Sequence, residues 1–350
     1  MPRLTIATIA SDAVLGAGIY QREIICRAPE ALDTRPGWTV DQTIVRSMRS
    51  PLPGNRRLPL GRVSTASVAV RRQLGRLIYP RDAVVHRMNL ELPPSPGADV
   101  VTLHDVVAWK YPDESAPVPA SVEEIRRAAA VICVSAFSAE EAVETLGIER
   151  PHVVHNGVDP RFYDAAAADD RLLRSLGITS PFVITTGGAS ERKNLAGLAD
   201  AWSRVHAARP DLTLVLTGPP HPRRTALFGS MPGVTLTGMV DSAVVPGLLA
   251  AAEAVVVPSL YEGFGFPALE GMAVGTPVVA ARTSSLPEVV EDGGLLVEPD
   301  GPSLAEGILD ITSGDPEVEV LVERGRARAR QLTWERCLAG HAEVWSSVAS

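Results

Sequence analysis

Short apolar runs alternate along the chain with longer segments whose apolar residues recur at helical spacing. In the first half, strands are expected over residues 4–9, 38–45, 83–85, 100–103, 131–134 and 152–154, and helices over 16–31 and 63–77. In the second half, strands are expected over 182–186, 212–216, 235–237, 254–257 and 278–280, and helices over 195–207 and 242–252. Short apolar strands separated by amphipathic helices predict an α/β protein whose parallel sheets are covered on both faces.

The strand and helix scheme occurs twice, and the least patterned stretch between the two occurrences is the alanine-rich segment 164–170. We therefore expect two doubly wound, Rossmann-like domains, at residues 1–165 and 166–334, in a chain of 350 residues. Ligands of such sheets bind beyond the carboxyl ends of the strands, so a cleft between the two facing domains is the expected site.

Composition narrows the class of protein. Hydrophobic residues make up 45% of the chain, which indicates real cores, and no apolar run reaches the ~20 residues of a membrane span. The N-terminal segment has the pattern of a strand and not of a signal peptide. The three cysteines, Cys26, Cys133 and Cys337, are far apart and lack metal-ligand spacing, which favours reduced thiols in a cytoplasmic protein.

Charge is distributed unevenly. The net charge of −8 argues against a nucleic-acid partner, and it lies entirely after residue 165, because the first half carries equal numbers of basic and acidic residues. No acid stands between Asp41 and Asp82, in a window with nine arginines: Arg46, Arg49, Arg56, Arg57, Arg62, Arg71, Arg72, Arg76 and Arg81. This window is either a solvated basic surface or a contact for an anionic acceptor or an acidic membrane surface.

Glu262 and Glu270 stand eight positions apart, with two glycines and Pro267 between them, directly after an apolar run. The pattern predicts a strand, a tight glycine turn and a helix start, where backbone N–H groups can approach an anion. Pro267 suits the first helical turn. Two acids beside such a turn suit a ligand with phosphates and hydroxyls, such as a sugar nucleotide; alternatively, Glu270 only complements the helix macrodipole.

A second glycine turn, Gly187-Gly188, leads through Glu191-Arg192-Lys193-Asn194 into a helix. The convergence of two cations with a helix N-terminus is typical of a pyrophosphate site, although the Gly-Lys-Ser/Thr of a P-loop is missing. The alternative is a pair of surface cations.

Three further features have weaker support. Gly16 and Gly18 follow the first predicted strand and either allow a turn with positive φ or let a phosphate or sugar approach the backbone. His104 ends the run 100–103, at the carboxyl edge where catalytic residues gather, and is either structural or a hydrogen-bonding partner of a sugar hydroxyl. The segment from Ser284 to Glu288 has the pattern of a capped helix start.

Taken together, these motifs resemble the large family 4 of retaining glycosyltransferases, which has the GT-B fold. The resemblance rests on Glu262 to Glu270, on Glu191-Arg192-Lys193-Asn194 and on the early glycines. It rests also on His155-Asn156-Gly157-Val158-Asp159, Ser135 to Ser138 and Ser284 to Glu288. It covers nearly the whole chain.

The resemblance implies a role for each residue. Lys193, assisted by Arg192, would neutralise the donor phosphates, although Gly188-Ala189 stands where many members carry an arginine. Glu270 would accept hydrogen bonds from ribose hydroxyls, Glu262 would contact the donor sugar, and His104 would lie near that sugar. The sugar and phosphate would be lined by backbone groups of Gly263, Phe264, Gly265 and Phe266. The base would be lined by backbone groups of Met239 and Val240. Residues 335–350 would form a helix that crosses back to the first domain.

The expected activity is retaining, metal-independent transfer of a hexosyl group to a hydroxyl of a glycan, lipid-linked or small-molecule acceptor. The donor would be a GDP- or UDP-sugar, with GDP-mannose-like donors slightly favoured, and no cofactor or metal is expected. The partners would be this nucleotide sugar and the acceptor sugar. The arginine window, residues 46–81, suggests a lipid-linked or peripheral membrane contact at the inner face. The alternatives are a sugar-nucleotide 2-epimerase and a non-catalytic sugar-nucleotide-binding protein.

Overall fold

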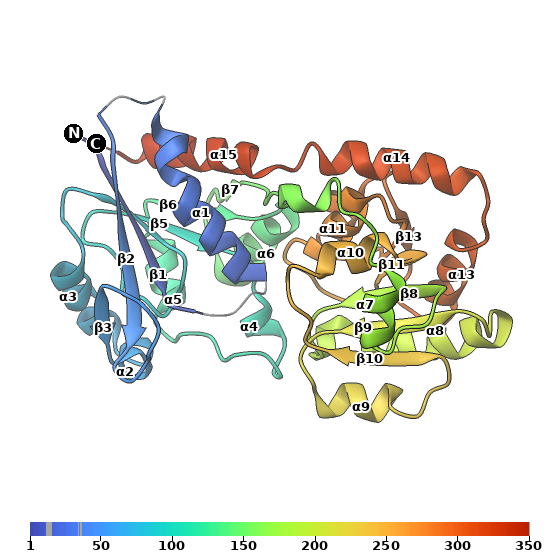
Figure 1. Cartoon of the computed structure of the whole chain (residues 1–350). Coiled ribbons are helices and arrows are strands. Elements are labelled where there is room, and N and C mark those ends of the chain that lie inside the picture. Colours follow the sequence, from blue (N-terminus) through green and yellow to red (C-terminus); the bar gives the residue numbers. More distant parts are fainter. Residues whose placement is uncertain (12–15, 34, 36, 350) are drawn as a thin grey trace. The chain divides into compact units, whose positions relative to one another are not determined.

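The computed structural model describes residues 1–11, 16–33, 35 and 37–349 (Figure 1). Two compact units divide the chain. Unit 1 comprises Met1–Gly157 together with Trp334–Ser350, and unit 2 comprises Val158–Thr333. Each unit contains one parallel sheet with helices, so the predicted α/β class with two doubly wound sheets is confirmed.

The seven-stranded sheet of unit 1 has the strand order β3-β2-β1-β4-β5-β6-β7. Its strands are β1 (Arg3–Ile9), β2 (Thr39–Ser47), β3 (Arg56–Leu58), β4 (Val84–Arg87), β5 (Ala98–Leu103), β6 (Ala130–Cys133) and β7 (His152–Val153). The helices are α1 (Gly16–Asp33), α2 (Leu60–Ser64), α3 (Val68–Ile78), α4 (Val107–Lys110), α5 (Ser121–Arg126), α6 (Ala136–Leu146) and α15 (Trp334–Ser347), the last of which packs against α1.

The six-stranded sheet of unit 2 has the order β10-β9-β8-β11-β12-β13. Its strands are β8 (Phe182–Thr186), β9 (Thr213–Thr217), β10 (Val234–Gly238), β11 (Ala254–Val257), β12 (Val278–Ala281) and β13 (Leu295–Val297). Its α-helices are α7 (Asp170–Ser175), α8 (Leu195–Ala208), α9 (Pro222–Phe228), α10 (Val245–Ala250), α11 (Phe266–Val274), α12 (Leu286–Val290), α13 (Gly301–Ile311) and α14 (Glu317–Ala329), and short 3₁₀ turns are η1 (Pro160–Phe162) and η2 (Glu191–Lys193).

The strand order reverses direction between β8 and β11, which are neighbours in the sheet of unit 2 although β9 and β10 lie between them in sequence. Loops that leave the carboxyl ends of such neighbours diverge and open a space for a ligand. The loop after β8 carries Arg192 and Lys193, and the loop after β11 carries Glu262.

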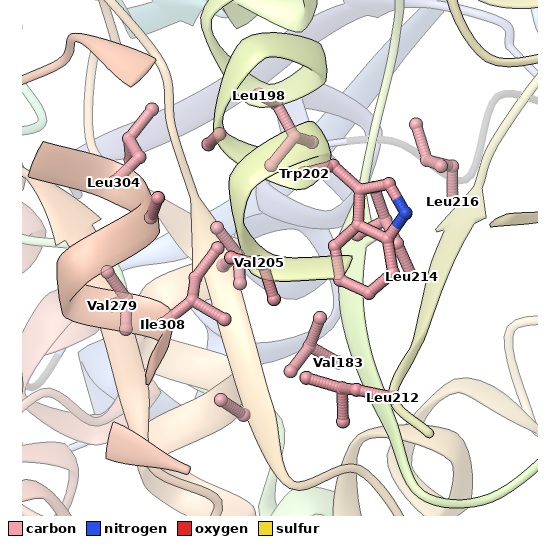
Figure 2. Packing of buried hydrophobic residues seen from close by; sticks show 14 of the residues in the cluster. Val183, Leu198, Trp202, Val205, Leu212, Leu214, Leu216, Val279, Leu304 and Ile308 are labelled. Carbon is pink, nitrogen blue, oxygen red and sulfur yellow. The ribbon is translucent and has the colours of Figure 1, made fainter. Parts of the chain in front are cut away.

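The core of unit 2 lies where α8 and α13 cover one face of this sheet (Figure 2). The Trp202 indole is fully buried and packs with Leu198 and Val205 of α8, and its Nε1 donates to the Pro232 carbonyl at 3.0 Å. Leu304 and Ile308 of α13 complete the cluster. The central strands are almost entirely buried, which explains why most of their residues are apolar.

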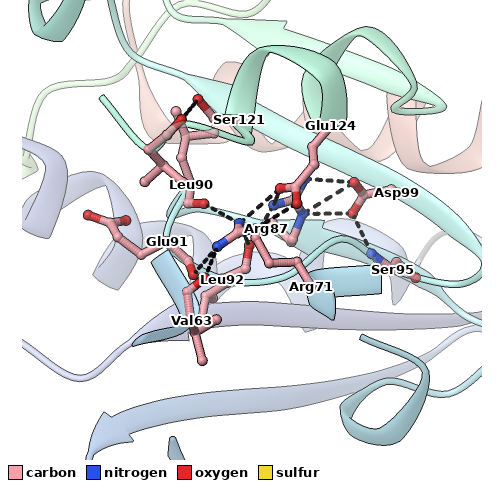
Figure 3. A network of polar contacts seen from close by, with 11 residues as sticks. Val63, Arg71, Arg87, Leu90, Glu91, Leu92, Ser95, Asp99, Ser121 and Glu124 are labelled. Atoms are coloured by element: carbon pink, nitrogen blue, oxygen red, sulfur yellow. Dashed lines mark hydrogen bonds and ion pairs between the residues drawn. The ribbon is translucent and has the colours of Figure 1, made fainter. Parts of the chain in front are cut away.

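Unit 1 contains a buried ion-pair network (Figure 3). Arg71 of α3 donates to both carboxylate oxygens of Glu124, at 2.6 and 2.9 Å, and to four backbone carbonyls. Arg87 donates to both oxygens of Asp99 and lies 3.5 Å from Glu124. Arg71 therefore cannot serve the predicted basic surface, because it is fully buried against its own acid.

Several predicted boundaries were wrong. The helix expected over 63–77 is two helices, because Ser67 is extended and separates α2 from α3. The helix expected over 242–252 begins only at Val245, with Pro246 in its first turn. The strands β3 and β13 and the helices α13 and α14 were not predicted. None of the described helices is long and apolar enough to cross a membrane.

Candidate functional site

The turn after β8 is fixed by Asn194, which joins η2 to α8. Its backbone is left-handed, with φ of 52°, and its side chain accepts a hydrogen bond from the Gly197 amide at 3.3 Å. Its Nδ2 donates to the carbonyls of Pro258, at 2.9 Å, and Pro299, at 2.7 Å. Asparagine tolerates this conformation better than most residues, so the position suits its side chain and backbone alike. The turn is thereby tied to the loop after β11.

Arg192 and Lys193 converge on Glu262. Lys193 Nζ lies 2.6 Å from Glu262 Oε1, and Arg192 Nη1 lies 3.1 Å from Oε2. Ser259 Oγ donates to Oε1 at 2.7 Å. The side chains of the three charged residues are only 20%, 14% and 9% exposed, in the order Arg192, Lys193, Glu262. The alternative that the two cations form a solvated surface pair is therefore wrong.

The Glu262 carboxylate is ionised at neutral pH. Burial alone would raise its pKa, but the charges of Lys193 and Arg192 and the hydrogen bonds of Lys193 and Ser259 hold the pKa below its ordinary value. A carboxylate offers about four lone-pair sites, and these three partners occupy three of them. By this count, one lone-pair site of the carboxylate has no partner among the described residues.

The loop after Glu262 is held by two serines. The amide of Glu262 donates to Ser284 Oγ at 2.9 Å, and Ser284 has a left-handed backbone, with φ of 53°. Ser285 Oγ donates to the carbonyls of Glu262 and Phe264, at 2.9 and 2.8 Å. The predicted helix start is confirmed, because Ser285 is the N-cap residue of α12 and Glu288 lies in its first turn. The predicted side-chain cap is wrong, because the Ser285 side chain makes no cap hydrogen bond.

Gly265, the N-cap residue directly before α11, has φ of +106°, and a Cβ there would stand 2.8 Å from Leu286. Only glycine fits both the conformation and the space. Pro267 lies in the first helical turn, as predicted.

Glu270 is the fifth residue of α11, beyond the first turn, so the alternative that it only complements the helix macrodipole loses its basis. Its side chain is partly accessible. Burial is the main cause that raises the pKa of Glu270 to about 8, with Asp159 raising it further and Arg161 opposing both. The group is thus largely protonated near pH 7.

A small open pocket lies at the carboxyl ends of β8 and β11, with about 290 Å³ of space including its opening to solvent. Among the predicted residues, Gly188, Lys193 and Glu262 line it. A Cβ built on Gly188 would meet nothing within 4 Å, so the loop borders open space. Met239 and Val240 follow β10, and Gly263, Phe264 and Phe266 belong to the loop before α11 or to its start. No group of three or more His, Cys, Asp or Glu side chains in the described parts of the chain could hold a metal ion.

The pocket is also lined by Arg224, which the sequence analysis did not single out. Arg224 lies on α9 and is 4% exposed. Its Nη2 donates to the carbonyls of Gly187, at 2.6 Å, and Gly188, at 3.1 Å, and its Nη1 donates to that of Pro219, at 3.1 Å. The only signal in the sequence is a pair of arginines shortly after a strand, which by itself does not predict burial.

His104 of unit 1 follows β5, as predicted. Its Nε2 is buried without a hydrogen-bond partner, and burial lowers the pKa of the ring to about 4, so the imidazole is neutral at pH 7. Ser138 Oγ donates to its carbonyl at 3.0 Å, and Ser135 caps the same helix, α6. The serine motif 135–138 therefore positions the backbone of His104.

Gly16 and Gly18 lie in the first turn of α1 and not in a loop before it. This helix presents Tyr20, whose ring packs edge-on against His104 with centroids 4.7 Å apart. The Tyr20 hydroxyl is 2.6 Å from Thr102 Oγ1 and 2.7 Å from His341 Nε2 of α15. Tyr20 of α1 thus contacts both His104 and His341 of α15.

Comparisons with known proteins bear on this site. The sequence profile described as "Glycosyltransferase Family 4" matches residues 22–162, and the profile described as "Glycosyl transferases group 1" matches residues 180–313. The O-antigen chain mannosyltransferase B of Escherichia coli is 30% identical over 292 residues, which are 76% of this chain and 75% of that protein.

A GDP-mannose-dependent phosphatidylinositol dimannoside mannosyltransferase of Mycobacterium tuberculosis is 31% identical over 214 residues, 60% of this chain and 55% of that protein. Among solved structures, Anabaena HepE in complex with UDP and glucose aligns with a TM-score of 0.74 and 21% identity over 99% of this chain and 100% of the other.

Proposed function

Because the chain belongs to the family 4 glycosyltransferases and has the GT-B fold, we propose that it moves a hexosyl group from a nucleotide sugar to an acceptor hydroxyl. The observation that carries this proposal is the convergence of Lys193 and Arg192 on Glu262 beside the pocket at β8 and β11. Two cations beside one acid suit a ligand that combines phosphates with hydroxyls.

In the proposed reaction, the bond between the anomeric carbon and the phosphate oxygen breaks, and a nucleoside diphosphate leaves. Negative charge builds on the departing phosphate, where Lys193, Arg192 and the N-terminus of α11 would stabilise it. Pre-positioned donors of this kind contribute ~3 kcal/mol each. The oxygen of the acceptor hydroxyl would bond to the anomeric carbon on the face that the leaving group departs, with retention of configuration. The hydroxyl proton would pass to the departing phosphate oxygen. No covalent intermediate is proposed.

The other site residues are assigned the roles that the family resemblance implies. The remaining lone pair of Glu262 would accept a hydrogen bond from a hydroxyl of the donor sugar, and Glu270 would accept from the ribose. His104 would hydrogen-bond a sugar hydroxyl through Nε2, which has no partner within the described residues. The phosphates and the sugar would be lined by backbone groups of Gly16, Gly18, Gly188 and residues 263–266. The base would be lined by backbone groups of Met239 and Val240.

We favour a GDP-mannose-like donor over a UDP-sugar. The support comes from relatives whose names state mannosyl transfer, one of them with GDP-mannose. A thermal-shift screen with GDP, UDP, dTDP and ADP would decide the nucleotide, because the nucleotide that binds the folded protein raises its melting temperature.

For the acceptor, we propose a lipid-linked or otherwise anionic glycan at the inner face of the membrane. Seven arginines of the window are exposed: Arg49, Arg56, Arg57, Arg62, Arg72, Arg76 and Arg81. Leu77 of α3 is 82% exposed and Val70, one heptad earlier on the same helix, is 51% exposed. Cations flanking exposed apolar side chains suit an anionic lipid surface.

The function is tested with Lys193→Ala and Glu270→Ala on a panel of nucleotide sugars, with the exposed Arg204→Ala as a control. Transfer by the lysine variant should fall by ~10²-fold or more, because a donor to the leaving group is lost. Wild-type rates in both site variants would overturn the assignment. Product analysis separates the rivals, since an epimerase releases nucleotide without an acceptor and a binding protein gives no turnover.

A further inference from the structure

Arg224 is a buried cation without a buried acid. The two other arginines with comparable burial, Arg71 and Arg87, each face a carboxylate at 2.6–2.8 Å. Within the described residues, no carboxylate lies within ion-pair distance of Arg224, and burial lowers the pKa of its guanidinium. An uncompensated buried charge is costly. A charge of this kind beside an open pocket is a candidate for binding an anionic ligand.

Next to Arg224, two loops of the backbone approach each other closely. Gly218, with φ of +133°, lets the end of β9 come so near to Gly187 that a Cβ would stand 2.0 Å from the Gly187 carbonyl. The guanidinium occupies the corner that these loops form, and its Nε has no hydrogen-bond acceptor among the described residues. The open space beside Gly188 belongs to the pocket that Arg224 lines.

The three cations around this pocket, Arg192, Lys193 and Arg224, differ in how far a nearby acid compensates their charge. Lys193 and Arg192 share the Glu262 carboxylate, so a large part of their charge is already compensated. Among the residues that the structure describes, Arg224 donates only to neutral carbonyls. The three cations and one acid carry a net charge of about +2, which matches the charge of a diphosphate ester.

We propose that Arg224 binds the diphosphate of the sugar-nucleotide donor, as the cation that the glycine at position 188 does not supply. This inference rests on the proposed function, because it deepens the same site. Arg224 would contact the phosphates from α9, whereas Arg192 and Lys193 would contact them from η2.

The experiment is calorimetric titration of the full chain with GDP and UDP, and with guanosine and uridine as probes that lack phosphate. Arg224→Gln should lower the affinity for the bound diphosphate by ~10–100-fold and leave the affinity for its nucleoside within about threefold. Arg224→Lys should recover part of the loss because it restores the charge. Arg223→Gln, on the same helix but facing Glu191 at 3.9 Å, is the matched control and should bind like wild type.

A purely structural Arg224 would lower the affinity for nucleoside and diphosphate equally, and either that result or unchanged diphosphate binding would overturn the inference. A wild-type protein that binds neither diphosphate would instead refute the proposed function. If the glutamine variant does not fold, NMR of the ¹⁵N-labelled wild type replaces it. The Nε–H resonance of Arg224 is assigned by its loss in Arg224→Lys. This resonance must shift when the diphosphate is added and must not shift when the nucleoside is added.

Discussion

The pKa of Glu270 gives a prediction that joins stability to donor binding. Burial raises this pKa from 4.5 to about 8 in the folded protein. Between these two values the native state holds a proton that the unfolded chain has lost, so the native state binds more protons than the unfolded one. The free energy of unfolding must therefore fall as the pH rises through this window and level off above about pH 8.

The magnitude follows from the size of the shift. Each pH unit inside the window costs at most ~1.4 kcal/mol, or ~4 kcal/mol between pH 5 and pH 8. The side chain keeps some contact with solvent, which screens the effect, and we discount the cost to about 2 kcal/mol. Glu270→Gln keeps the shape and neutrality of the protonated acid and removes the titration.

Urea unfolding of the wild type and of Glu270→Gln at pH 5, 6, 7 and 8, at one ionic strength, measures this term as a difference. The variant should gain about 2 kcal/mol relative to wild type from the lowest to the highest pH. A difference that stays constant with pH would refute the reasoning, because it would show that Glu270 ionises in the folded protein near its ordinary pKa.

Donor binding should show the opposite pH dependence. An ionised Glu270 accepts two ribose hydroxyls better than a protonated one, so wild-type affinity for the donor nucleotide should rise toward pH 8. Glu270→Gln should bind more weakly at pH 8 and show no such rise. Titration calorimetry at the same pH values measures both proteins.

Two further predictions concern Glu262 and Tyr20. Glu262→Gln removes the acid that Lys193 and Arg192 share; transfer should fall by ~10²-fold while the affinity for free GDP or UDP is kept or increased, since the cations lose their competitor. Equal losses of binding and transfer in steady-state and titration assays would contradict that role. Tyr20→Phe deletes a hydroxyl bonded to Thr102 and His341 and should cost ~1–3 kcal/mol in urea unfolding, with the ring contact to His104 kept. An unchanged unfolding free energy would disprove it.

Much of the fold could be predicted from the sequence because its signals are local. The predicted strands 182–186 and 254–257 coincide with the bounds of β8 and β11, since a strand that is buried on both faces is mostly apolar. The strands β3 and β13 were missed because they are three residues long and depend on their neighbours for pairing. Local propensity carries little information at that length.

Within the site, the sequence singled out the residues but not their partners. Glu262 and Lys193 were identified separately, whereas their ion pair spans 69 residues of sequence. Ser285 has the pattern of a helix cap, yet its hydroxyl bonds to the Glu262 carbonyl on another loop. A hydroxyl chooses between such acceptors by distance, which is set by the folding of both loops.

By itself, the sequence determined two parallel sheets, the loops that bear the acids and cations, and the family to which these motifs belong. Each is encoded in a window of a few residues, through the period of apolar positions, the freedom of glycine and the type of charge. Only the tertiary structure decided which charges are compensated. It buried Arg71 against Glu124 and set Arg224 beside open space without an acid, because the free energy of a buried charge depends on groups that the fold brings from distant parts of the chain.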